Sequence, residues 1–129
     1  MKFTRTVTVY NSVEADFKKT LLPHLLCGVH AEKTRGAESA AEGDKNTDNL
    51  LVIIPFKPHK NGFLTPLEFE NCEDKNAHWT LSPGDLISVG DTGAADNFAE
   101  LTARAETFRI ISVKTFDFGG LPHWKVICK

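Results

Sequence analysis

Several short segments of this chain carry an apolar residue at every second position, and this alternation limits what the chain can fold into. In the segment Phe3–Tyr10, the side chains of Phe3, Val7 and Val9 share one face, although Arg5 interrupts it. Threonines fill most of the other face. Successive side chains of a strand point to opposite sides, so this pattern of β-branched residues predicts a half-buried strand.

The C-terminal part of the chain alternates in the same way. Thr107–Phe116 alternates along its length, and Trp124–Cys128 places three apolar side chains on one face. Gly119 and Gly120 lie between the two segments and permit the chain to reverse. We therefore predict a β-hairpin over Thr107–Lys129.

Two further segments are predicted to be extended for other reasons. Leu50–Phe56 (LLVIIPF) is short, apolar and β-branched, as in a strand buried on both faces, and Pro55 should interrupt its ladder. The leucines of Phe17–Lys33 also fit a helical spacing, but Pro23 lies among them. Because proline inside a helix costs about 3 kcal/mol, we predict two extended pieces, Phe17–Leu22 and Leu25–Lys33.

The middle of the chain combines turns with brief helices. A hydroxyl at Thr65, a proline next to it and Glu68 three residues later predict a helix start. Trp79–Leu81 and Leu86–Val89 are predicted as short strands around a turn at residues 82–85. Asp96–Arg104 is predicted as a short helix that Asp96 caps.

Arg35–Asn49 contains no large apolar residue, so burial cannot offset the entropy of ordering it, and we predict a flexible loop at 35–49.

With 129 residues the chain is long enough for a single domain, 1–129. The fold class predicted is mainly β, or β-rich α+β. We expect a small barrel or sandwich of about seven short strands, with one or two short helices and the long mobile loop.

Charge and cysteine content limit the environment and the partners. Fifteen Lys and Arg against 17 Asp and Glu give a net charge of −2, which argues against a dedicated nucleic-acid binder. The three cysteines, Cys27, Cys72 and Cys128, are odd in number and widely spaced, which favours a reducing compartment. The N-terminus lacks the apolar run of a signal peptide, and no segment is long enough to span a bilayer. We expect a soluble intracellular protein.

The sequence contains no recognisable catalytic, cofactor or metal site. His24 and Cys27 are spaced like half of a zinc site, but no second pair exists, so scattered histidines are the favoured reading. GxSxG and phosphate-cradling motifs are absent, and most of the carboxylates lie in turns or at helix caps. We therefore expect no enzymatic activity and no cofactor.

Four residues are candidates for contact with a partner. Lys57, His59 and Lys60 form a basic cluster beside Phe56, for which a solvated turn is favoured over contact with DNA or a partner. Trp79 fits a core position and an interface position equally well, since aromatic side chains dominate both. For Trp124, the core is favoured.

Segments along most of the chain resemble small structural proteins from prophages of Gram-positive bacteria, encoded in the head and tail morphogenesis cluster. The most specific blocks are WTLxPGDxIxxG, from Trp79 to Gly90, and SVxxxxFGxxxHWxV, from Ser112 to Val126. The other matching segments are TVTVYN (6–11), FKKTLLPHLLCGVHAE (17–32), LVIIPF (51–56) and FLTPLEFE (63–70). The order of the strands also resembles head-closure and related connector proteins, which are small β-barrels with a mobile loop.

This resemblance implies a structural role without catalytic residues. Its expected partners are other phage structural proteins, namely portal or adaptor, tail and capsid proteins, with a ring of identical subunits as one assembly. The expected location is the virion, and the host cytoplasm during assembly, without a membrane and with only incidental DNA contact. Two other readings remain open: a non-virion assembly or regulatory module, and a small hydrolase or metal-binding protein.

Overall fold

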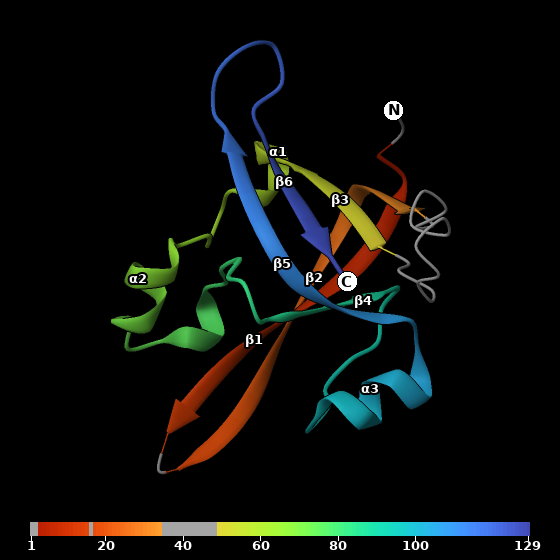
Figure 1. The fold of residues 1–129 in the computed structure, drawn as a ribbon. Coiled ribbons are helices and arrows are strands. Elements are labelled where there is room, and N and C mark those ends of the chain that lie inside the picture. The colour runs from red at the N-terminus through yellow and green to blue at the C-terminus, as the bar shows by residue number, and fades with distance from the viewer. Residues whose placement is uncertain (1–2, 16, 35–48) are drawn as a thin grey trace, which may run out of the picture.

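The computed structural model describes residues 3–15, 17–34 and 49–129, and its strands close into a barrel (Figure 1). The strands follow the order β1-β2-β3-β6-β5-β4 around the barrel, and all neighbours are antiparallel. Their bounds are β1 Arg5–Ala15, β2 Lys18–Thr34, β3 Asn49–Pro55, β4 Leu86–Val89, β5 Thr107–Phe116 and β6 His123–Cys128. The prediction of a mainly β fold is confirmed.

The described residues form six strands, against the seven or so expected. One difference is Trp79–Leu81, where Trp79 makes only an isolated parallel bridge to Phe63. The other is that the two pieces predicted over Phe17–Lys33 form a single strand. The loop predicted at 35–49 lies outside the described residues, apart from Asn49, which begins β3. No helix in the described ranges is both long and apolar enough to cross a membrane.

β2 is one continuous strand of 17 residues rather than two extended pieces. Pro23 is tolerated because β2 at this point has β1 on one side only: β3 joins it from His30 onward. Proline has no backbone N–H to donate, and at an open edge no neighbouring strand requires that hydrogen bond. Gly28, at φ +81°, has no partner in β1 and forms a bulge where β2 turns from β1 towards β3.

The barrel interior is filled by the apolar faces of the strands and by both tryptophans. Trp79 and Trp124 pack edge to face, with ring centroids 5.6 Å apart, and neither is exposed beyond 2%. Val126 and Cys128 are buried beside Trp124 on β6, as the alternation predicted. The interior position of Trp124 is confirmed, and Trp79 is a core residue too.

Three short α-helices and one 3-10 turn connect the described strands. They are α1 Phe56–His59, α2 Pro66–Glu70, η2 Lys75–Ala77 and α3 Phe98–Arg104. At α2 the capping box is present: the Glu68 N–H donates to Thr65 Oγ1, and the Thr65 N–H donates to Glu68 Oε1. The predicted cap of α3 is wrong by one residue, because Asn97 Oδ1 accepts the Glu100 N–H at 2.8 Å.

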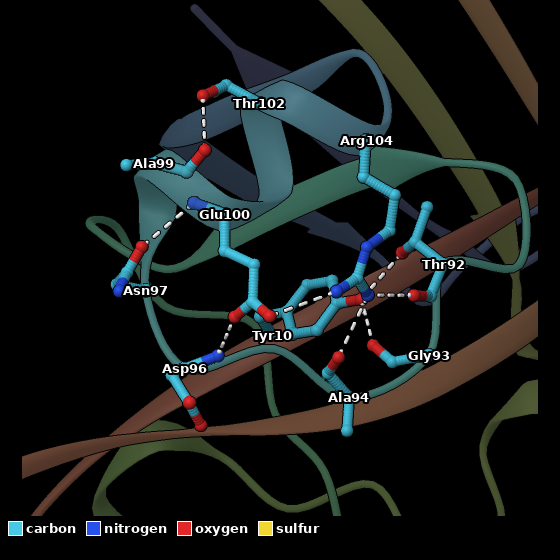
Figure 2. Close-up of polar contacts among 10 residues, drawn as sticks. All are labelled: Tyr10, Thr92, Gly93, Ala94, Asp96, Asn97, Ala99, Glu100, Thr102 and Arg104. Atoms are coloured by element: carbon cyan, nitrogen blue, oxygen red, sulfur yellow. Dashed lines mark hydrogen bonds and ion pairs between the residues drawn. The ribbon is translucent and has the colours of Figure 1, made fainter.

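The segment before α3 is held by Arg104 (Figure 2). Its guanidinium donates to the carbonyl oxygens of Thr92 at 2.6 Å and Ala94 at 2.9 Å, and to Glu100 Oε1 at 3.1 Å. The buried Tyr10 ring extends from β1 to the same segment, where its hydroxyl contacts Thr92 Oγ1 and donates to the Gly93 carbonyl. The α3 side of the barrel is thereby fixed to β1.

Candidate interaction site

The ends of β1 and β2 form a two-stranded arm that projects from the barrel. β4 pairs with β1 only over Val7–Tyr10, so residues 11–15 of β1 pair with residues 18–22 of β2 alone among the described strands. Figure 1 shows this arm pointing away from the other strands. Asn11 and Leu21 at the base of the arm are buried, whereas Glu14 and residues 17–20 are exposed. The projection of the arm therefore suits contact with another molecule.

Phe17 lies at the tip of the arm with its side chain fully exposed. Its φ of +61° makes it the only non-glycine among the described residues with a positive φ. A left-handed conformation costs a bulky L-residue roughly 1–2 kcal/mol. The ring of Phe17 is exposed and its backbone conformation is unfavourable. The stability of this chain alone therefore does not explain an aromatic residue at this position. Its position favours a role in contact with a partner.

A groove of about 710 Å³ runs beside the base of the arm. One wall is β1 from Ser12 to Glu14, the second is α2, and the third is the segment from Thr80 to Asp85. Leu67 of α2 projects into solvent at this groove and is 69% exposed. The groove therefore offers an apolar wall that no described residue covers.

Ser12, Thr80 and Asp85, which line the groove, belong to a buried polar network centred on Asn11. The Asn11 amide donates to the Thr80 carbonyl at 2.7 Å and to Asp85 Oδ2 at 3.0 Å, while its own Oδ1 accepts the Thr80 N–H at 3.1 Å. Asp85 Oδ1 accepts the Ser12 N–H at 3.2 Å. The hydroxyl of Thr80 is buried without a hydrogen-bond partner in the described part of the chain.

Burial raises the pKa of Asp85 above its ordinary value of 3.8, although hydrogen bonds from Asn11 and Ser12 and the charge of Lys19 act in the opposite direction. A carboxyl with a raised pKa in a groove is a general-acid candidate. Here both of its oxygens accept hydrogen bonds that join β1 to the turn at 82–85. The geometry fits a structural acceptor better than a group that exchanges protons with a substrate.

The rim of the groove is acidic. Glu14 and Glu70 are exposed, and neither forms an ion pair within the described ranges. The ammonium of Lys75 also reaches the rim, but it donates to the carbonyl oxygens of Glu70 and Cys72. The groove therefore suits a segment that carries an apolar side chain together with a basic one.

The four residues predicted as partner contacts lie elsewhere and do not form one surface. Trp79 is fully buried, so it has no surface to offer a partner. His59 turns inward, is 8% exposed, and places Nε2 at 3.4 Å from the Gly28 carbonyl. Lys57 and Lys60 are exposed, with the Lys60 ammonium 4.9 Å from the centre of the Phe56 ring. Of the four predicted residues, only Lys57 and Lys60 are exposed and available for contact with a partner.

The histidines and cysteines are also placed apart. His24 stacks on Trp79, with ring centroids 4.9 Å apart, and Cys27 is exposed on the same strand. Burial, and then the charge of His59, lower the pKa of His24. Burial raises the pKa of Cys128 to about 12, so it remains an unreactive thiol. No metal-binding cluster of His, Cys, Asp or Glu occurs among residues 3–15, 17–34 and 49–129.

The sequence does not predict the arm or the groove. One signal for the tip was present: Phe17 is a lone aromatic residue between the charged residues Glu14 and Lys18, where the chain reverses. The groove gave no such signal, because its three walls come from segments that are far apart in the sequence.

Comparison with known proteins gives one match. A model described as "Family of unknown function (DUF6751)" matches residues 2–129. No curated protein and no solved structure matches the chain significantly.

Proposed function

The chain belongs to the DUF6751 family, whose function is unknown, and we propose that it is a structural protein of a phage or prophage particle. It acts as a head–tail connector, a head-closure protein or a minor capsid component. Its partners are portal or adaptor, tail and capsid proteins. Its place of action is the virion, after assembly in the host cytoplasm.

The observation that carries this proposal is the projecting arm with Phe17 at its tip. A fully exposed aromatic side chain in a left-handed conformation stabilises nothing in the isolated chain. Such a side chain becomes useful when a neighbouring molecule covers it, since aromatic residues supply much of the binding energy of interfaces. Assembly through protein–protein contacts gives it that neighbour.

The residues that resemble the phage proteins support the proposal by where they lie. In the first block, Trp79 is in the core, residues 82–85 form the turn and Asp85 lines the groove. In the second block, Trp124 and Val126 fill the barrel from β6. The shared motifs thus build the scaffold that carries the arm and the groove.

A non-virion assembly or regulatory module would use the same arm and groove, so its contacts alone do not separate the two functions. The test is mass spectrometry of density-purified particles beside extracts of the infected cells. A virion protein is expected in both samples. Its presence in the cell extract and its absence from the particles would establish the non-virion alternative.

A further inference from the structure

We propose that the groove beside the arm receives the arm tip of a second copy of this chain, with Phe17 against Leu67 and Lys18 beside Glu14 and Glu70. This inference deepens the proposed function by naming one partner. It rests on that function only in placing the contact inside a particle.

The tip and the groove are complementary in character. The tip presents one fully exposed aromatic ring followed by the exposed Lys18. The groove presents the exposed side chain of Leu67 and two carboxylates without ion-pair partners in the described ranges, those of Glu14 and Glu70. Apolar contact at the centre with opposite charges at the rim is the usual anatomy of a specific interface.

The tip cannot reach the groove of its own chain. Val13 and Glu14 line the groove, and both lie on the arm itself, a few residues from Phe17. Over that stretch β1 is paired with β2 in continuous register, and a paired ribbon rises about 3.3 Å per residue away from the barrel. A tip that occupies this groove therefore comes from another molecule.

A tip in a groove joins two different surfaces of the same chain, so the contact is heterologous. Each copy then has one free tip and one free groove, and further copies can add. The tip is small, and its contact buries less than the roughly 1,200 Å² of a stable interface. Association should be weak for the purified chain and become strong only where several copies are held together.

The test uses two variants of the full chain that each lack one half of the contact. Phe17→Gly removes the ring, and glycine adopts the positive φ of that position without strain, so the turn is kept. The groove variant carries Leu67→Ser and Glu70→Lys, both at exposed positions outside the capping box of Thr65 and Glu68. Phe118→Ser is the matched control, since Phe118 is 73% exposed in the loop between β5 and β6.

The readout is the amide NMR spectrum. Wild type and Phe118→Ser are expected to show signals of residues 12–14 and 66–70 that shift with concentration, with a dissociation constant on the order of 10⁻⁴ to 10⁻³ M. Each half-variant alone should show no such shift. A mixture of labelled Phe17→Gly with the unlabelled groove variant should restore the shifts, because one intact tip meets one intact groove.

Three results would overturn the inference. The first is a wild-type spectrum that does not change with concentration up to about 1 mM. The second is self-association that Phe118→Ser weakens as much as Phe17→Gly does. The third is a mixture of the two half-variants that stays monomeric while wild type associates.

Failure of this inference and failure of the proposed function give different results. Particles that contain the protein, together with a purified chain that shows no tip contact, would disprove the second-copy contact alone. A chain that associates as described but is absent from particles would disprove the virion role alone.

Discussion

The side chain of Asn11 binds both backbone polar groups of Thr80, its amide donating to the carbonyl at 2.7 Å and its Oδ1 accepting the N–H at 3.1 Å. These two hydrogen bonds resemble those that a neighbouring strand would make. They form at the point where β4 no longer pairs with β1. Asn11 is 2% exposed, so these bonds are shielded from water. The arm and the segment from Thr80 to Asp85 are joined by this side chain and by the hydrogen bond from the Ser12 N–H to Asp85 Oδ1.

Replacing Asn11 with Ala should lower the free energy of unfolding by about 2–4 kcal/mol, because the variant leaves the Thr80 backbone groups and Asp85 buried without this partner. Urea denaturation followed by tryptophan fluorescence measures the change. Asn71→Ala is the control, since Asn71 is exposed and bonds only the Leu67 carbonyl. Equal stability of the two variants would show that the Asn11 network contributes nothing.

Asp85 should make stability depend on pH in an unusual direction for a carboxyl. Its pKa is raised in the folded state, so between 3.8 and the folded pKa the folded chain binds more protons than the unfolded chain. The contribution of Asp85 to the free energy of unfolding therefore falls as pH rises through that window. Urea denaturation from about pH 3.5 to about pH 7 gives the free energy of unfolding of wild type and of Asp85→Asn. The wild-type value minus the Asp85→Asn value at each pH isolates the contribution of Asp85. A difference that increases with pH would contradict the raised pKa.

His24 should titrate below its ordinary pKa of 6.5, mainly because of burial and secondarily because of the charge of His59. His59→Gln should raise the pKa of His24 only in part. The imidazole signals in an NMR titration measure this, with His123→Gln, at the start of β6, as the control. Because the folded pKa is lowered, stability from His24 is complete above pH 6.5 and is lost as pH falls through the folded pKa. Full recovery of the His24 pKa in His59→Gln would show that charge, not burial, is the main cause.

Arg104 should hold the segment between β4 and α3. Arg104→Met removes hydrogen bonds to the carbonyl oxygens of Thr92 and Ala94 and keeps much of the aliphatic stem. We expect a loss of about 1–2 kcal/mol in the free energy of unfolding, moderated because the side chain is 39% exposed. Amide hydrogen exchange should accelerate over residues 92–104 before it does in β6. Thr102→Ala, at an exposed position of the same helix, should leave both measurements nearly unchanged.

The strands with strong alternation were predictable because one local pattern determined each of them. Thr107–Phe116 has the predicted bounds and residues 124–128 lie within β6, whereas the segment predicted as Phe3–Tyr10 extends as β1 from Arg5 to Ala15. The continuity of β2 was not predictable, since the cost of Pro23 depends on whether a second strand lies beside it, and that depends on tertiary structure. Trp79 remained undecided for a similar reason: it joins the core with only a single bridge to Phe63.

The interaction site was less predictable than the fold. The groove joins residues 12–14, 66–70 and 80–85, and nothing local in any of these segments indicates the other two. His59 shows the same limit, because its neighbours suggested a basic surface while contact with Gly28 turns it inward. A site formed by distant segments becomes visible only when the barrel has brought them together.

The most direct test of a particle protein that acts through its arm is the number of copies per purified particle. A strain lacking the gene would be complemented with wild type or with Phe17→Gly, and the copies counted by mass spectrometry against a labelled standard. We expect a fixed number of wild-type copies in every preparation and at least about a tenfold decrease for Phe17→Gly, since burial of an aromatic ring is worth more than 1.4 kcal/mol. Particles that assemble and infect without any copy of the wild-type chain would contradict the account.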